Sequence, residues 1–455
     1  MTLIKTDICV IGGGSGGLSV ASGAAQMGAK VVLIEKGEMG GDCLNSGCVP
    51  SKALLSAGEK GMDWDAAHAH VKSAIATIAP HDSQERFEGL GCTVIREHAR
   101  FTGPRELIAG DTTVRAKRFV IATGSRPFVP EVPGLDEVPH YTNETIFDLK
   151  EKPDHLLVIG GGPIGCEMAL AHRRLGCEVT ILEGQTALGK DDPDAAALVL
   201  DSLRAQGIEI VEDAEAVRVR ETEGRLEIVT SSGKTFTGSH ILVAVGRKAN
   251  VEDMGLEAAG VDTTGRGIKV DDRLRSSNRR IYAVGDITGG LQFTHVAGYH
   301  GGVVIRPTVL RLPAKARTDH IPWCTYTDPE LAQVGLTESA ARKAHGDKLT
   351  VVRAEFAGND RAIATGDTTG FIKVMVVKSK PVGVTLVGKN AGELIAPWSL
   401  AISQKLSLSA ISGMVLPYPT MSEISKRASG NFYSPKLFEN ETLKRVVRVV
   451  QRLVP

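Results

Sequence analysis

The chain has 455 residues, of which 42% are hydrophobic and 23% are charged, and its formal net charge is zero. A chain of this length is expected to form two to four globular domains. Zero net charge gives no electrostatic reason to expect nucleic acid or an anionic membrane as a partner. No apolar run is long enough to span a membrane. Because the chain has only seven Cys and its N-terminus does not read as a secretory leader, we expect a cytoplasmic, reducing location.

The N-terminal stretch predicts a dinucleotide-binding unit. A buried strand at 7–11 leads into a glycine-rich turn, a helix at 18–27 and a second strand at 30–34. In such a unit the first glycine allows the tight turn, the second lets the backbone approach a pyrophosphate, and the third allows close helix–strand packing. An acid that ends the second strand, 18 positions after the last glycine, suits a ribose hydroxyl. These residues are Gly12, Gly14, Gly17 and Glu35.

A cysteine pair follows directly, in the stretch GGDCLNSGCVPSK. Cys43 and Cys48 lie five positions apart, and Pro50 predicts that a helix begins near Val49 or Pro50. Cys48 would then lie at the positive end of that helix, where a lowered thiol pKa suits a reactive thiolate. The alternative is two unrelated buried cysteines in a tight turn.

The same pattern of strand, glycine turn, helix, strand and acid occurs a second time. The strands are expected at 155–159 and 178–182, with the helix at 166–175 between them, and the acid again comes 18 positions after the last glycine. Two copies predict two nucleotide sites, and the second acid favours NAD(H) over NADP(H) because it would repel a 2′-phosphate. These residues are Gly160, Gly162, Gly165 and Glu183.

Other turns at strand ends are candidate cofactor contacts. The turn after a strand at 119–122 is equally consistent with a ligand contact or an ordinary turn. Asp286 ends a strand at 281–284, where it would bind a sugar or ribityl hydroxyl or cap the next turn. The cofactor contacts expected outside the glycine patterns include Thr123, Gly124, Ser125, Gly246 and Ala297.

The predicted fold class is α/β, with two doubly wound dinucleotide-binding domains and a C-terminal α+β domain. The first domain is expected at 1–150 and, after the chain returns to it, at 271–318. The second occupies 151–270, and the α+β domain occupies 319–455.

These motifs together resemble the pyridine nucleotide-disulfide oxidoreductases, a family that includes dihydrolipoamide dehydrogenase, glutathione reductase and mercuric reductase. The resemblance covers essentially the whole chain and includes AVGD at 283–286 and TDPELAQVGLTE at 327–338. It implies FAD on the first glycine pattern, NAD(P)H on the second, and a C-terminal dimerisation domain that makes a homodimer.

The resemblance also implies roles for single residues. Cys43 is similar to the thiol that faces substrate, and Cys48 to the charge-transfer thiol that faces the flavin. Lys52 and Glu167 match an ion pair beside the flavin ring. Asp286 matches a contact to the ribityl chain, and Ala99 the position whose backbone meets adenine.

Departures from the family pattern limit what substrate can be predicted. Disulfide reductases carry His where this chain has Tyr418, although Glu423, the other half of their dyad, is present. A phenol with a pKa near 10 is a poor proton shuttle at neutral pH. Mercuric reductases are similar here, with Tyr before Pro, but they also carry a C-terminal cysteine pair, and this sequence has no Cys after Cys324.

Three functions remain open at this point. The first is an NADH-dependent oxidoreductase acting on a small disulfide or dithiol, similar to dihydrolipoamide dehydrogenase. The second is a reductase of a soft metal ion, and the third is a flavoprotein electron-relay subunit with little thiol turnover. Cys9, Cys166 and Cys177 are interpreted as packing residues, and the roles of Cys92 and Cys324 are left open. The spacing of these cysteines is not typical of a resident metal site.

Overall fold

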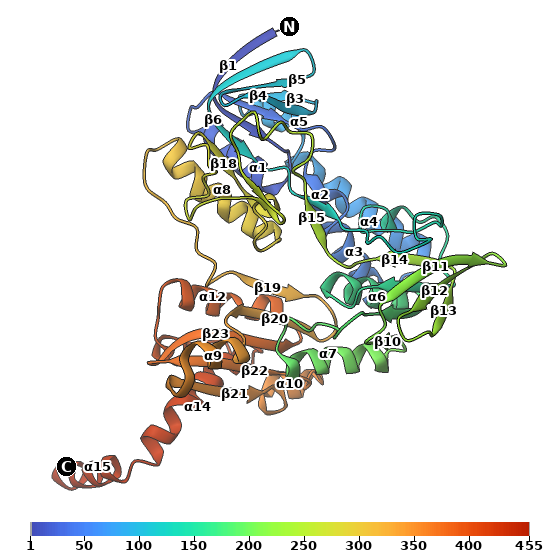
Figure 1. Ribbon diagram of the computed structural model, residues 1–455. Coiled ribbons are helices and arrows are strands. Elements are labelled where there is room, and N and C mark those ends of the chain that lie inside the picture. Colours follow the sequence, from blue (N-terminus) through green and yellow to red (C-terminus); the bar gives the residue numbers. More distant parts are fainter. Residues whose placement is uncertain (1, 455) are drawn as a thin grey trace. The chain divides into compact units, whose positions relative to one another are not determined.

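The structure is a computed structural model that describes residues 2–454 (Figure 1). The chain divides into two compact units. Unit 1 comprises the residues up to Gln185 together with Ile208–Arg317, and unit 2 comprises Thr186–Gly207 together with the residues from Thr318 onward. The predicted fold class is confirmed, because unit 1 contains two parallel sheets with flanking helices and unit 2 contains an antiparallel sheet with helices.

The first sheet of unit 1 carries the first glycine pattern. Five strands run parallel in the order β3-β2-β1-β6-β18, while β5 and β4 continue from β6 as an antiparallel meander. This order places β1 in the centre, so the turn after β1 opens at the carboxyl edge of the sheet, where ligands bind in such folds. The strands are β1 (Thr2–Ile11), β2 (Val31–Ile34), β3 (Cys92–Ile95), β4 (Ala99–Gly103), β5 (Glu106–Ala109), β6 (Thr112–Ile121) and β18 (Ile281–Ala283).

Helices cover this sheet, and two of them contain the Cys43 and Cys48 stretch. Helix α1 (Ser15–Gln26) packs against α8 (Thr294–Thr308), which lies in the 271–318 segment. The other helices are α2 (Gly41–Asn45), α3 (Cys48–Glu59), α4 (Trp64–Ile78) and α5 (Gln84–Gly89), with short 3₁₀ turns η1 (Ala79–His81) and η2 (Ile146–Asp148). The region from 53 to 91 holds the end of α3 and two further helices.

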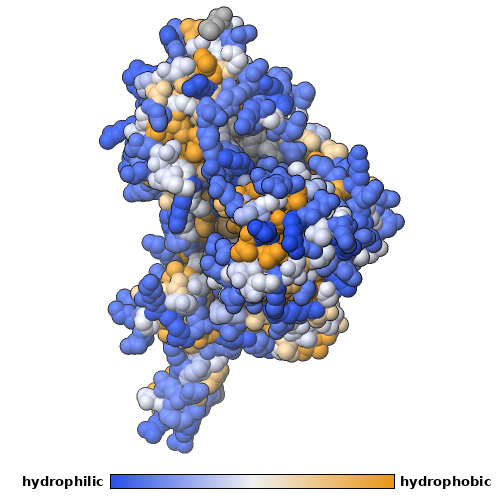
Figure 2. Space-filling view, turned by 45° about the vertical axis from the view of Figure 1, so that its right-hand side comes forward, coloured by the Kyte–Doolittle hydropathy of each residue, from blue (hydrophilic) through white to orange (hydrophobic). Residues whose placement is uncertain are grey.

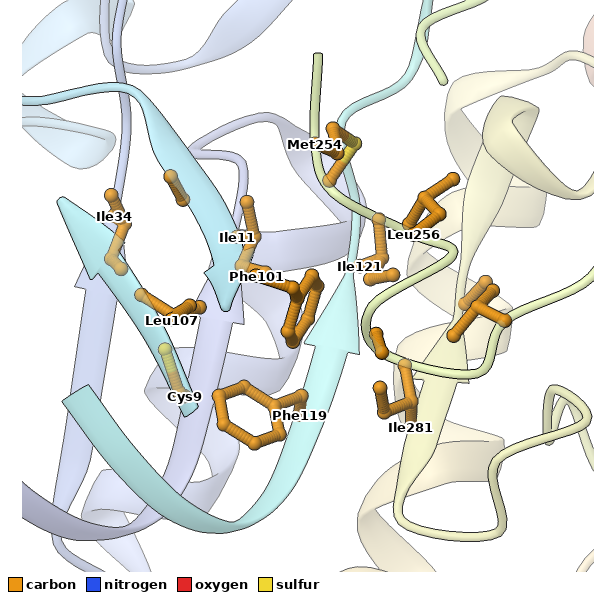
Figure 3. Close-up of a cluster of buried hydrophobic side chains, with 14 of the residues drawn as sticks. Cys9, Ile11, Ile34, Phe101, Leu107, Phe119, Ile121, Met254, Leu256 and Ile281 are labelled. Carbon is orange, nitrogen blue, oxygen red and sulfur yellow. The ribbon is translucent and has the colours of Figure 1, made fainter. Parts of the chain in front are cut away.

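A buried hydrophobic cluster fixes the first sheet against the segment that precedes β18 (Figure 3). Phe101 and Phe119 meet edge to face with ring centroids 5.1 Å apart, and both are almost completely buried. Burying one such ring stabilises the fold by about 1.5–3 kcal/mol. Cys9 lies in this cluster, and Cys166 and Cys177 are also fully buried, so the structure supports the reading of these three as packing residues.

The second parallel sheet of unit 1 carries the second glycine pattern. Its order is β10-β9-β8-β14, and a three-stranded antiparallel sheet, β11-β12-β13, follows β10. A short antiparallel pair between β7 and β15 joins the segments that follow β6 and β14. The elements are β7 (Ser125–Pro127), β8 (His155–Ile159), α6 (Pro163–Arg174), β9 (Glu178–Leu182), β10 (Glu209–Val211), β11 (Ala216–Thr222), β12 (Arg225–Thr230), β13 (Thr235–Gly238), β14 (His240–Val243) and β15 (Arg247–Ala249).

Unit 2 is built on an antiparallel sheet in the order β19-β20-β23-β22-β21. Its strands are β19 (Pro322–Thr325), β20 (Glu330–Gly335), β21 (Leu349–Glu355), β22 (Phe371–Val377) and β23 (Lys380–Gly388). Its helices are α7 (Pro193–Ala205), α9 (Glu338–His345), α10 (Asp360–Thr365), α11 (Ala391–Leu394), α12 (Ala396–Ser403), α13 (Leu408–Ser412), α14 (Glu423–Phe438) and α15 (Glu441–Leu453). Helices α14 and α15 were not predicted from the sequence.

A buried lysine fastens the α7 segment to this sheet. Nζ of Lys373, on β22, donates to Asp192 at 2.9 Å and to Asp194 at 2.9 Å, and it also pairs with Glu338 at 2.9 Å. Burial lowers the pKa of Lys373, and the hydrogen bonds to the three carboxylates more than offset that effect, so the net shift is upward. Within residues 2–454, no helix has the length and apolar character needed to cross a membrane.

Candidate active site

The cysteine pair is held against the first glycine turn. Gly40 and Gly41 have φ of 89° and 64°, in the left-handed region that favours glycine. The N–H of Gly40 donates to the carbonyl of Gly13 at 2.9 Å, and a Cβ on Gly41 would lie 2.7 Å from Cα of Gly14. The two glycines therefore let the redox stretch approach the turn expected to bind the flavin nucleotide.

Cys48 is the first residue of α3, close to the helix start that Pro50 predicted. Its Sγ lies 3.4 Å from Oγ1 of Thr294, at the start of α8. A hydrogen bond from the thiol of Cys43 lowers the pKa of Cys48 to about 6, aided by Thr294 and Lys52 and opposed by burial. The helix N-terminus adds to this preference for a thiolate.

The partner thiol is shifted the other way. Donation to Cys48 and burial both raise the pKa of Cys43. The two sulfurs thus share one proton near neutral pH, which stays on Cys43 while the negative charge resides on Cys48. This arrangement keeps the thiolate of Cys48 at the N-terminus of α3. The thiol of Cys43 must therefore lose its proton to an acceptor before Cys43 can act as a nucleophile.

Lys52 and Glu167 form the ion pair that the resemblance implied. Nζ of Lys52 donates to Oε2 of Glu167 at 2.6 Å. Lys52 lies one helical turn after Cys48 on α3, and Glu167 lies on α6 of the second dinucleotide domain, with a side chain only 6% exposed. The buried carboxylate therefore fixes an ammonium group next to the thiolate.

A polar network beside the cysteines was not anticipated from the sequence. Oδ1 of Asp42 accepts from Asn143 at 3.0 Å and lies 3.3 Å from Nη2 of Arg247. Nε of Arg247 donates to Oγ of Ser125 at 2.7 Å, and Ser125 in turn donates to Oδ2 of Asp286 at 2.6 Å. Burial raises the pKa of Asp286, while Ser125 and Arg247 oppose that shift.

The network contains two predicted residues, Ser125 and Asp286, and Asp42, which precedes the predicted Cys43. Its other two members, Asn143 and Arg247, were not predicted. Ser125 and Asp286, expected as separate cofactor contacts, are in direct contact with each other. Arg247 follows the Gly246 turn at the edge of a parallel sheet, a position that could have suggested a ligand or site contact. Asn143 lies in an irregular segment whose sequence gives no signal.

The first glycine turn has the geometry of a nucleotide cradle. A Cβ on Gly12 would lie 2.3 Å from the carbonyl oxygen of Ala122, and one on Gly17 would lie 1.9 Å from the carbonyl oxygen of Gly12, so both positions need glycine. Oε2 of Glu35 accepts from the N–H of Gly13 at 2.5 Å. Gly14 precedes the 12-residue helix α1, whose N-terminal N–H groups suit a phosphate.

A cavity of about 330 Å³ opens beside this turn in unit 1. Gly12, Glu35, Ala99 and Thr123 all line it, although they come from four separate stretches of the sequence. Ala99 is the first residue of β4 and is buried, which leaves its backbone as the contact group. A glycine backbone, an apolar wall and a carboxylate fit the adenosine part of FAD.

The second glycine turn repeats the first one closely. A Cβ on Gly160 would lie 2.6 Å from the carbonyl oxygen of Ala244, and one on Gly165 would lie 2.0 Å from that of Gly160. Oε2 of Glu183 accepts from the N–H of Gly161 at 2.7 Å, just as Glu35 does in the first turn. Gly162 and Gly246 have no atom within 4 Å of a built Cβ, so both border open space that a dinucleotide backbone could occupy.

The remaining candidate contacts lie close to the first turn. Oγ1 of Thr123 donates to the carbonyl of Asn250 at 3.0 Å, and Gly124 has a φ of 65° that suits a glycine turn. Ala297 lies in the first turn of α8, where its Cβ would meet a Cβ built on Gly285 at 3.0 Å.

The predicted acid–base residues lie in unit 2. Tyr418 is 70% exposed, and its hydroxyl donates to Oδ2 of Asp360 at 2.8 Å. This hydrogen bond raises the pKa of Tyr418 above that of an ordinary phenol. Glu423 is the first residue of α14. Asp360, which the sequence analysis missed, is therefore the hydrogen-bond partner that the structure gives Tyr418, in place of Glu423.

Comparisons with known proteins agree with this geometry. The model of the pyridine nucleotide-disulphide oxidoreductases matches residues 6–301, and the model of their dimerisation domain matches residues 321–429. A mercuric reductase of Staphylococcus aureus is 34% identical over 94% of this chain and 82% of its own length. A dihydrolipoyl dehydrogenase of Geobacillus stearothermophilus is 35% identical over 94% of this chain and 96% of its own.

A solved structure of the flavoprotein disulfide reductase RclA from Escherichia coli, as its Cu(II) complex, aligns with a TM-score of 0.88. It is 28% identical and covers 94% of this chain and 99% of its own. The chain belongs to the pyridine nucleotide-disulphide oxidoreductase family and is an FAD-dependent oxidoreductase that uses NAD(P)H.

Proposed function

We propose that this enzyme uses NADH to reduce a small-molecule disulfide through the Cys43–Cys48 pair. The observation that carries the proposal is the placement of Cys48 at the start of α3, with its pKa lowered and Lys52 one turn away. When bound, FAD supplies a carrier for the two electrons that pass between the nicotinamide and the cysteine pair.

The chain's own residues prepare the reduced pair for this chemistry. Cys48 stays anionic because the thiol of Cys43, the hydroxyl of Thr294 and the ammonium of Lys52 all favour its thiolate. Glu167 keeps Lys52 in place through a 2.6 Å hydrogen bond. Glu183 disfavours the 2′-phosphate of NADPH, which supports NADH as the electron donor.

The proposed exchange consumes both thiols of the reduced pair. Cys43, once deprotonated, attacks one sulfur of the substrate disulfide, forming a mixed disulfide and releasing the first substrate thiolate. Cys48 then attacks the sulfur of Cys43, which breaks the mixed disulfide and releases the second thiolate. The pair is oxidised to the Cys43–Cys48 disulfide, the substrate is reduced by two electrons, and both released thiolates take up protons.

Steady-state NADH oxidation by the FAD-loaded enzyme tests this proposal. We expect turnover with lipoamide or another small disulfide, and a loss of at least about 10³-fold in Cys43→Ser and in Cys48→Ser, because a missing nucleophile removes the covalent step. Cys324→Ser, the same change in unit 2, serves as the control and should keep its activity. Undiminished disulfide reduction in either active-site variant would disprove the proposal.

A soft metal ion as substrate is the second candidate. The observation that favours it is Tyr418, whose hydrogen bond to Asp360 raises its pKa and makes it a poor proton acceptor at neutral pH. A soft cation binds the Cys48 thiolate and displaces the proton of Cys43 to solvent as that sulfur binds. No substrate thiolate then leaves and takes up a proton, as happens in thiol–disulfide exchange. Oxidation of NADH that depends on Hg(II) and not on disulfides would select this candidate, and inactivity with both would favour the electron-relay role.

The dimerisation domain supports a homodimer as the working assembly. The low cysteine content, seven in 455 residues, supports a reducing, cytoplasmic location. Sedimentation equilibrium of the full-length enzyme measures the first point, and fractionation of the source cells measures the second.

A further inference from the structure

The most strongly amphipathic helix of the structure, α15, plays no part in the chemistry described above. It spans Glu441–Leu453, and none of its 13 residues, all of which the structure describes, is buried. Figure 1 shows it at the end of α14, away from the five-stranded sheet of the same unit. It also lies beyond residue 429, where the match to the dimerisation domain ends.

One side of α15 is a continuous apolar stripe. Its members follow the i, i+3, i+4, i+7 spacing that places side chains on one helical face. They are between 37% and 76% exposed. The stripe comprises Leu443, Val446, Val447, Val450 and Leu453. At the preceding helix end Phe438, 69% exposed, adds an aromatic side chain.

The other side of α15 is basic. The helix carries Lys444, Arg445, Arg448 and Arg452 against a single acid, Glu441, which gives it a net charge of +3. The zero net charge of the whole chain therefore conceals a local excess of positive charge. In Figure 2, the visible surface around α15 is mostly hydrophilic.

Such a helix is not stable in water on its own. Thirteen residues are close to the lower limit for an isolated helix, and four valines lower its propensity further. Its stability therefore depends on a surface that covers the apolar stripe. Of the surfaces available, an anionic bilayer offers both an apolar layer for the stripe and negative charge for the basic side chains.

We propose that α15 binds the surface of an anionic lipid membrane and holds the enzyme there as a peripheral protein. Pairing of α15 with the same helix of a second copy is disfavoured, because each helix would bring a net charge of +3 to the other and only one acid to offset it. The helix would lie in the membrane interface, with the valine stripe inward and the basic side chains among the headgroups.

Vesicle flotation with the FAD-loaded, full-length enzyme tests the proposal. Vesicles of phosphatidylglycerol and phosphatidylcholine in equal parts are compared with vesicles of phosphatidylcholine alone, at low and at high salt. We expect binding to the anionic vesicles that weakens as salt rises, since each basic side chain near the surface contributes about fivefold.

Three variants separate the contributions. Arg445→Glu combined with Arg448→Glu should lower partitioning at least about 20-fold, and Val447→Asp at least about tenfold. Lys343→Glu combined with Lys348→Glu, two exposed charge reversals elsewhere in unit 2, is the matched control and should bind as the original chain does. NADH oxidation should stay unchanged in all three, because α15 is not part of the active site.

Several results would overturn the proposal. These are no binding to anionic vesicles, equal binding to neutral vesicles, and unchanged binding in the Arg445→Glu, Arg448→Glu variant. Dissociation of the homodimer by Val447→Asp, measured by sedimentation, would show instead that a second copy covers the stripe.

Discussion

Removing the hydroxyl of Thr294 should raise the pKa of Cys48. Oγ1 of Thr294 lies 3.4 Å from Sγ of Cys48, and its hydrogen bond favours the thiolate. Hydrogen bonds to charged groups contribute about 1.5–3 kcal/mol, and a long bond to sulfur belongs at the low end. About 1.4 kcal/mol corresponds to one pKa unit, so Thr294→Val should move the midpoint from about 6 to about 7.

The sign of the effect follows from which form is stabilised. The hydroxyl donates to the deprotonated sulfur, so its loss disfavours deprotonation, and at pH 6.5 the thiolate fraction should fall from roughly three quarters to roughly one quarter. The assay is the rate of iodoacetamide alkylation against pH in the reduced enzyme, with modification of Cys48 quantified by mass spectrometry.

Thr294→Ser serves as the matched control, because it keeps the hydroxyl and should keep a midpoint near that of the original enzyme. The reasoning would be refuted if the valine variant kept the original midpoint. It would also be refuted if the serine and valine variants shifted the midpoint equally, since the loss of a methyl group would then explain the result.

Three further predictions concern residues of both units. Tyr418→His should raise disulfide turnover by about 10²-fold, because an imidazole titrates near neutral pH; an unchanged kcat would contradict the account of a missing proton shuttle. Glu183→Ala should lower the ratio of kcat/KM for NADH to that for NADPH at least about tenfold, and an unaltered ratio would remove Glu183 from cofactor selection. Lys373→Met should destabilise unit 2 by about 3–5 kcal/mol in urea unfolding, because it leaves the almost fully buried Asp192 without its cation. Adding Asp192→Asn should restore part of that loss, and no restoration would refute the buried-charge explanation.

The sequence determined the local units of this protein. Each strand–glycine–helix–strand unit can be recognised because its residues are close in the chain and because the turn geometry leaves glycine as the residue that fits at Gly12 and Gly160. The start of α3 at Cys48 was predictable for the same reason, since Pro50 and the apolar run after it are local signals. The fold class and the cofactors followed from the order of these units.

Tertiary structure decided what surrounds the cysteine pair. Thr294 lies 246 positions from Cys48 in the chain, and Arg247 reaches Ser125 through the pairing of β7 with β15. Such contacts depend on how strands are ordered in a sheet, and no local pattern encodes that order. Tyr418 illustrates the limit best. The family resemblance pointed to Glu423, five residues on, as the other half of a dyad at this position, whereas the fold brings Asp360, 58 residues away, to the Tyr418 hydroxyl. Residue spacing predicts short-range geometry, but the packing of distant segments determines which side chains come into contact.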